Sequence, residues 1–135
     1  MAKKLFLDNK DLGLLILRVG LGLSYLLGHG FLKLKGGTET WTHIGSNMSN
    51  LGITFAPAFW GLCAALGESL GGLLLMTGIL FRPACLLLAF IMIIAILSGL
   101  KDGIDFYNWA WPAEMLVVMV ALFICGPGKY SLKYR

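Results

Sequence analysis

Apolar residues in this chain fall into four long blocks separated by short polar segments. The blocks cover about residues 12–32, 58–80, 83–100 and 109–126. At a rise of 1.5 Å per residue, each is about long enough to cross the hydrocarbon core of a bilayer, the last two being short. The pattern therefore predicts an all-α integral membrane protein, a four-helix bundle that forms one domain over residues 1–135.

The connections between the blocks are uneven in length. The turn at residues 80–83 is tight, so we expect the second and third spans to form an antiparallel hairpin. The outer segment from Lys33 to Ala56 is long enough for a short amphipathic helix on the outer surface, with Thr38 as its N-cap. An irregular cap packed on the bundle is the alternative. The apolar positions that favour the helix recur at intervals of three and four: Trp41, Ile44, Met48 and Leu51.

Composition supports the membrane assignment. The chain is 58% hydrophobic and 13% charged, whereas a soluble domain has about 25% charged residues. Its net charge is +4, but the basic residues lie at the ends of apolar blocks, where they indicate topology and not nucleic-acid binding.

The distribution of lysine and arginine predicts that both termini are cytoplasmic. The expected inner residues are Lys3, Lys4, Lys10, Arg82, Lys129, Lys133 and Arg135, against Lys33, Lys35 and Lys101 outside. The tryptophans agree with this orientation, because all of them fall at the outer boundary, as an interfacial belt: Trp41, Trp60, Trp109 and Trp111.

A few polar residues interrupt the apolar blocks. In the first block, Arg18, Tyr25 and His29 share one helical face with Gly22. Glu68 lies near the middle of the second block. Its backbone differs in height from that of Arg18 by about 6 Å, so we expect the two side chains to pair. Tyr25 and His29 would form an outer layer with Glu114, early in the fourth block.

Two interpretations of these residues remain open. A buried Arg18–Glu68 pair that only stabilises the bundle is one. The other is a polar cavity for a quinone-like head group, a proton relay or another ligand, because intramembrane ionisable residues are costly and mark functional sites. The candidate cofactor-binding residues are then Arg18, Tyr25, His29, Glu68 and Glu114. Around Glu68, "GESLG" predicts close helix packing.

The sequence has no signals for a haem site, a metal site, a redox-active cysteine pair or a catalytic motif. Of the two histidines only His29 lies in a span, which disfavours haem, and no group of residues has metal-ligand spacing. Cys63, Cys85 and Cys125 form no CxxC pair and are interpreted as small packing residues. No catalytic motif is present, so whether the chain is an enzyme stays open.

The motifs "LRVGLGLSYLLGHGFLKL", "GLCAALGESLGGLLLMTGILFRPACLLLAFIM" and "GPGKYSL" occur in this order along the chain. In these motifs the sequence resembles the DoxX family of small bacterial membrane proteins. The resemblance implies a compact four-helix bundle, in the bacterial inner (cytoplasmic) membrane, in which Arg18, His29, Lys33 and Glu68 match the family's polar positions. Some relatives look like membrane subunits of redox systems, including thiosulfate-to-quinone electron transfer and an oxidative-stress complex.

Two functions follow as hypotheses. The first is a membrane subunit of a larger electron-transfer complex with a quinone-adjacent polar site; any redox activity would need partner subunits. The alternative is a non-catalytic scaffold in which the buried Arg18–Glu68 pair is purely structural. Transport is disfavoured, because the sequence lacks the broken helices and repeats typical of transporters.

Overall fold

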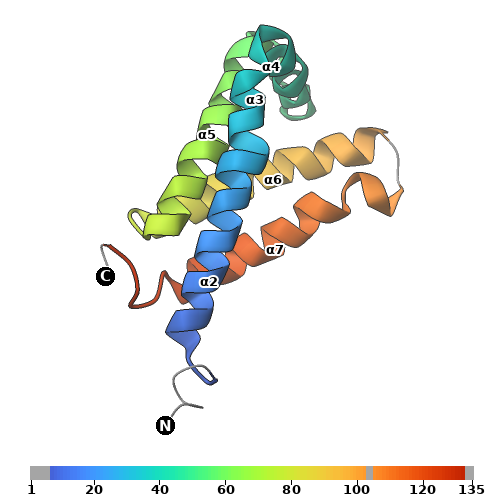
Figure 1. Cartoon of the computed structure of the whole chain (residues 1–135). Helices are drawn as coiled ribbons and strands as arrows, with labels where there is room; N and C mark the ends of the chain where they lie inside the picture. The colour runs from blue at the N-terminus through green and yellow to red at the C-terminus, as the bar shows by residue number, and fades with distance from the viewer. Residues whose placement is uncertain (1–6, 103–104, 133–135) are drawn as a thin grey trace.

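The computed structural model describes residues 7–102 and 105–132, and over these residues the chain is helical, without strands (Figure 1). The all-α prediction is therefore confirmed. Lys3, Lys4, Lys133 and Arg135, used to predict the orientation, lie outside the described residues. The elements are α2 (Lys10–Leu23), the π-helix η1 (Ser24–Gly30), α3 (Phe31–Lys35), α4 (Gly37–Gly45), the 3-10 helix η2 (Ser46–Leu51), α5 (Pro57–Thr77), α6 (Phe81–Asp102), the 3-10 helix η3 (Phe106–Asn108) and α7 (Ala110–Cys125).

Within the described residues, three helical segments are long and apolar enough to cross a membrane. They are the continuous rod α2–η1–α3 with 26 residues, α5 with 21, and Phe81–Lys101 of α6 with 21, and their mean hydropathies are 1.5, 1.5 and 2.6. The chain is thus a multi-pass membrane protein. Helix α7 has 16 residues and is about 24 Å long, short of a core of about 30 Å. That α7 is a fourth span stays a prediction.

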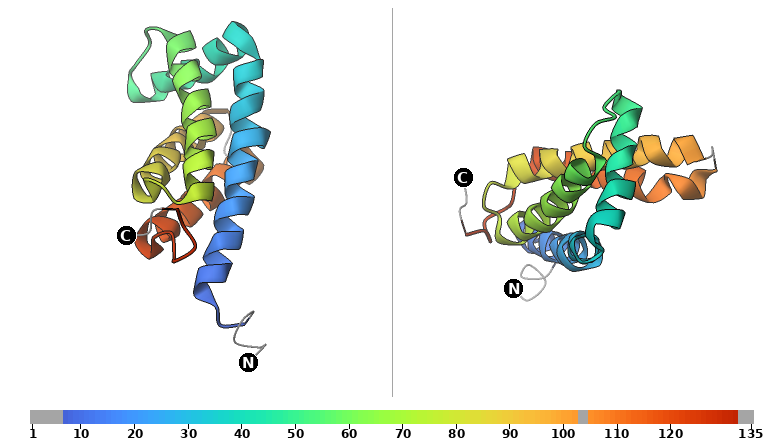
Figure 2. Two further views of the ribbon diagram at one scale, coloured as in Figure 1. Left: turned by 60° about the vertical axis from the view of Figure 1, so that its left-hand side comes forward. Right: turned by 90° about the horizontal axis from the view of Figure 1, so that it is seen from above.

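The long helices form two antiparallel pairs that cross steeply. In Figures 1 and 2 the α2–η1–α3 rod lies beside α5, and α6 lies beside α7. The turn from α5 to α6 is as tight as expected, with positive φ at Gly78 (82°) and Leu80 (47°). However, α6 then runs away from α5, so the expected α5–α6 hairpin is wrong along most of its length.

Glycines bring α5 close to both neighbours, which confirms the tight packing predicted around "GESLG". A methyl group on Gly72 would lie 2.6 Å from the carbonyl oxygen of Gly22, and one on Gly67 or Gly71 would lie 3.0–3.1 Å from side chains of α6. Small residues allow helix backbones to approach in this way in lipid. Contact at short range through glycine also allows α6 to cross α5 steeply.

Helix α4 and η2 form a cap, residues 37–51, over the N-terminal end of α5. A methyl group on Gly45 would lie 1.6 Å from the carbonyl oxygen of Pro57, so α4 packs directly on α5. A helix was expected here, but its proposed N-cap is wrong: α4 follows Gly36, with no side-chain cap, because α3 continues almost directly into α4. Trp41 Nε1 donates to the carbonyl oxygen of Lys33 at 2.9 Å and ties the cap to the rod.

The apolar core lies where the two helix pairs cross. Its buried residues come from the rod, α5, α6 and α7: Tyr25, Leu75, Phe81, Cys85, Leu88, Ala89, Met92, Met119 and Leu122. Cys85 packs here as expected. Cys63 and Cys125 are exposed and do not belong to this core.

Candidate functional site

Arg18 is completely buried near the C-terminal end of α5, and its guanidinium donates to four backbone carbonyl oxygens. Nε donates to Leu75 (3.0 Å) and Nη2 to Met76 (2.9 Å), both in the last turn of α5. Nη1 donates to Pro127 (3.0 Å) and Tyr130 (2.7 Å) in the segment after α7. Carbonyls at a helix C-terminus carry the negative end of the helix dipole, so they compensate the buried positive charge.

The predicted Arg18–Glu68 pair is therefore wrong. The height argument placed the two backbones within reach, but backbone carbonyls at the end of α5 are nearer acceptors for Arg18. These acceptors come together only because the C-terminal segment folds back onto the bundle. Its backbone N–H groups donate from Leu132 to the Thr77 carbonyl (2.9 Å) and from Lys129 to Asp11 Oδ1 (3.0 Å). Arg18 thus holds the fold together at this end.

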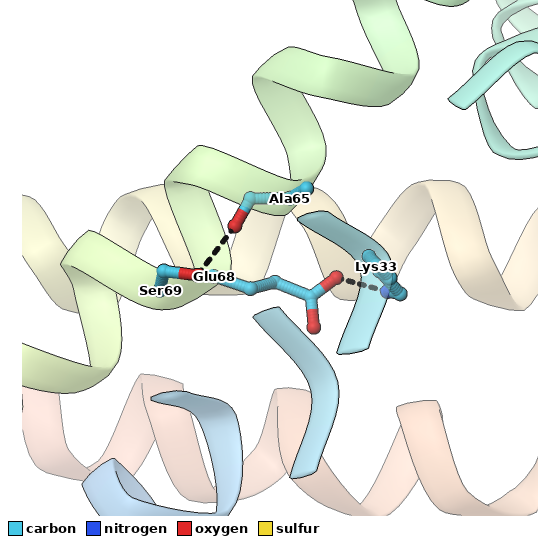
Figure 3. Close-up of polar contacts among 4 residues, drawn as sticks. All are labelled: Lys33, Ala65, Glu68 and Ser69. Atoms are coloured by element: carbon cyan, nitrogen blue, oxygen red, sulfur yellow. Dashed lines mark hydrogen bonds and ion pairs between the residues drawn. The ribbon is translucent and has the colours of Figure 1, made fainter. Parts of the chain in front are cut away.

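Glu68 is also fully buried and forms an ion pair with Lys33 of α3 (Figure 3). Lys33 Nζ donates to Glu68 Oε1, and the Lys33 side chain is 29% exposed. The second oxygen, Oε2, is buried and has no hydrogen-bond partner within the described chain. An ionised carboxylate with one unsatisfied oxygen is costly inside a membrane protein, which marks Glu68 as a candidate ligand-binding residue.

The π-helix η1 carries Tyr25 and His29 between Arg18 and Lys33. A π-helix accommodates extra residues per turn and is frequent at functional sites. His29 stacks on Trp111 of α7, with ring centroids 4.5 Å apart and planes inclined by 28°. Tyr25 is buried beside both rings, 6.0 Å from His29 and 6.3 Å from Trp111, and its hydroxyl is buried without a partner among residues 7–102 and 105–132. Glu68 lies within electrostatic range of Tyr25 and His29.

A pocket of about 170 Å³ lies between α5, α6 and the cap, and Glu68 and Lys33 contribute to its wall. Trp60 Nε1, from another wall residue, is a buried donor that also lacks a partner in the described part of the chain. The pocket lining thus combines Lys33, Glu68 and Trp60 with apolar residues. The complete lining is Lys33, Ile44, Gly45, Asn47, Met48, Trp60, Ala64, Glu68, Ile91, Met92, Ile94, Ala95 and Trp111.

The structure separates the residues that the sequence grouped into one site. Glu68 lines the pocket, and Tyr25 and His29 adjoin it through Trp111. Arg18 lies at the C-terminal end of α5. Glu114 is exposed on α7 and does not line the pocket.

Sequence reasoning missed three contributors to the pocket. Lys33 was counted as an outer charge, although the resemblance placed it among the family's polar positions. Trp60 and Trp111 were interpreted only as interfacial residues. The "HGFLK" spacing, which places a lysine four residues after His29, was the available signal for Lys33.

The fold and the polar pocket define a small, helical, multi-pass membrane protein with a buried ion pair. The chain belongs to the DoxX family, whose model matches residues 13–100. The match covers Arg18, Lys33 and Glu68 but ends before Trp111 and the returning C-terminal segment. Comparison with curated proteins gave no match, and comparison with solved structures gave none either.

Proposed function

We propose that this protein is a small membrane subunit of a redox complex and that the pocket beside Glu68 receives a quinone-type head group. The observation that carries the proposal is the buried Lys33–Glu68 ion pair, whose two residues both line a pocket between membrane helices. Binding sites for small molecules are mostly apolar with a few placed polar groups, and this pocket has that composition.

The walls of the pocket suit a head group with a single ring. Trp60 and Trp111 offer aromatic faces, while Ile91 and Met92 belong to the apolar wall on α6. The volume of about 170 Å³ is smaller than the roughly 300–1000 Å³ of pockets for drug-sized ligands. A head group would enter the pocket, and an isoprenoid tail would remain in the lipid.

The chain would act together with a larger membrane complex, in the bacterial inner membrane with both termini in the cytoplasm. Its described residues contain no group of three or more His, Cys, Asp or Glu side chains that could hold a metal ion. In this proposal a cofactor-bearing partner subunit carries out the electron transfer.

Gentle extraction from the native membrane, followed by mass spectrometry of co-purifying subunits and small molecules, tests this function. We expect a quinone and at least one cofactor-bearing subunit in stoichiometric amounts. Recovery of the bare protein, or of the protein with lipid alone, would contradict the proposal.

A scaffold without a ligand is the second candidate. Arg18 favours it, because its hydrogen bonds hold α5 and the C-terminal segment in place. A stoichiometric protein partner without any quinone in the same experiment would support the scaffold.

A further inference from the structure

A second pocket lies at the C-terminal end of α5, and Glu68 is not part of its lining. It has a volume of about 440 Å³ and lies between α2, the last turn of α5 and the C-terminal segment. Because α5 is long enough to cross a bilayer, its last residue, Thr77, lies near the boundary between the hydrocarbon core and the lipid headgroups. The complete lining is Arg18, Val19, Met76, Thr77, Lys129, Tyr130, Ser131 and Leu132.

Lys129 brings an accessible positive charge to this pocket. The residue is exposed, and its Nζ lies 5.3 Å from the centroid of the Tyr130 ring, which belongs to the same lining. Within residues 7–102 and 105–132, no carboxylate forms an ion pair with Lys129. Its ammonium group is therefore available to an anion at the pocket.

Arg18 adds a second positive charge behind the pocket wall. Its guanidinium is fully buried, so it does not contact a ligand directly. The carbonyl groups that accept its hydrogen bonds stabilise it as dipoles but carry no net charge, and none of the described carboxylates pairs with it. A buried charge is screened less than an exposed one, so the field of Arg18 extends into the adjoining pocket.

The charged residues at this end of the molecule are mostly positive. Asp11 accepts the backbone N–H of Lys129, but it lines a neighbouring cleft and not this pocket. Among the described residues, two carboxylates at this end, Asp8 and Asp11, face four cations: Lys10, Arg18, Arg82 and Lys129. An anion in the pocket would offset this imbalance.

The remaining lining suits a lipid. Val19, Met76 and Leu132 are apolar, and Leu132 is 77% exposed. Basic pockets between helices at the membrane surface bind the headgroups of anionic lipids. We propose that this pocket binds the phosphate group of an anionic phospholipid, with Lys129 as the contacting cation and the apolar residues beside the start of the acyl chains. The proposal is independent of the quinone site.

Native mass spectrometry of the purified full-length protein in mild detergent tests the proposal. The protein is titrated with phosphatidylglycerol and, separately, with phosphatidylcholine of the same acyl chains, and the bound fractions give an apparent dissociation constant for each. Because Lys129 and Arg18 both attract the anionic lipid, phosphatidylglycerol should bind at least about tenfold more tightly. Lys129→Gln should reduce this preference about fivefold, the usual contribution of one lysine near a membrane surface.

Two further variants locate the site. Lys10→Gln removes the same charge at the same end of the molecule, from an exposed residue outside this pocket, and should retain the wild-type preference within about twofold. Leu132→Glu places a carboxylate at the pocket and should abolish the preference, because like charges repel. Lys129 and Leu132 are exposed, so both variants should fold as the wild type does.

Each of three results would overturn part of the proposal. Equal binding of the two lipids would overturn the anionic site itself. Equal losses in Lys129→Gln and Lys10→Gln would indicate attraction by overall charge and would overturn the assignment to this pocket. Glycerophosphoglycerol, the headgroup without acyl chains, should leave bound phosphatidylglycerol in place even in excess; displacement would overturn a lipid as the source of the phosphate group.

Discussion

Lys33 and Glu68 form an ion pair across the contact between α3 and α5, although 35 positions separate them in the chain. The pair places a positive charge beside the buried carboxylate of Glu68, and both residues line the pocket. Arg18, the buried cation of the same helical rod, donates its hydrogen bonds to backbone carbonyl groups. Arg18 and Lys33 therefore have separate tasks: Arg18 binds carbonyl groups at the C-terminal end of α5, and Lys33 binds Glu68 near the middle of α5.

Removing Lys33 should destabilise the protein. Lys33→Met leaves Glu68 buried without its counter-charge, and breaking a buried pair in this way costs about 3 kcal/mol, the lower end of the usual range because Lys33 is partly exposed. Equilibrium unfolding in mixed detergent micelles measures the change. Lys35→Met, at an exposed position in the same helix, should stay within about 0.5 kcal/mol of wild type. Equal stability of the two variants would contradict the role of Lys33.

A double-mutant cycle between Arg18 and Glu68 should show no coupling. Arg18→Met strands four carbonyl oxygens, and Glu68→Leu strands Lys33, but the two side chains share no partner. Their effects on the free energy of unfolding should therefore add within about 0.5 kcal/mol. The cycle between Lys33 and Glu68 is the matched comparison and should give a coupling of about 1–3 kcal/mol. If Glu68→Leu restored the stability lost in Arg18→Met, the two side chains would be energetically coupled, which would contradict the structure.

The close approach of η1 to α5 should make Gly30 intolerant of a side chain. A methyl group on Gly30 would lie 2.1 Å from Ser69 Oγ and 2.6 Å from the Ser69 backbone nitrogen. Gly30→Ala should therefore destabilise the protein by about 1–3 kcal/mol. Gly28 lies in the same π-helix, and the nearest atom to an added methyl group is 3.9 Å away, so Gly28→Ala should be nearly neutral. Thermal unfolding of both variants in the same detergent compares them, and a neutral Gly30→Ala would argue against this helix contact.

Loss of the Tyr25 hydroxyl should not harm the fold. The hydroxyl is buried without a hydrogen-bond partner in the described structure, so Tyr25→Phe removes an unsatisfied group and should raise the free energy of unfolding by about 1 kcal/mol. Tyr107→Phe, at a position that is 90% exposed, serves as the control and should change little. A clear destabilisation by Tyr25→Phe would mean that the hydroxyl has a partner, and it would bring Tyr25 back into consideration as a ligand-binding residue.

The positions of the helices could be predicted from the sequence because the hydrophobic effect acts on runs of neighbouring residues. Each of the four predicted blocks overlaps one long helix, and the ends differ by a few residues: the third begins at Phe81, two residues early. The helical nature of the outer connection was also predictable, from apolar residues recurring every three or four positions. The π-helix could not be predicted, because no particular residue type marks the extra residue in its turn.

The partners of the buried charges could not be predicted, since the decisive groups are far apart in the chain or belong to the backbone. No pattern of side chains predicts that the carbonyl groups of Leu75 and Tyr130 accept hydrogen bonds from Arg18, because every residue has a carbonyl group. The Tyr130 carbonyl group reaches Arg18 only because the C-terminal segment folds back onto the bundle. The sequence by itself determined an apolar, helical membrane protein with two costly charges inside, through residue type and periodicity. The tertiary structure alone decided that Glu68 meets Lys33 at a pocket, because the close contact of Gly30 with Ser69 that brings this part of the rod to α5 joins segments far apart in the chain.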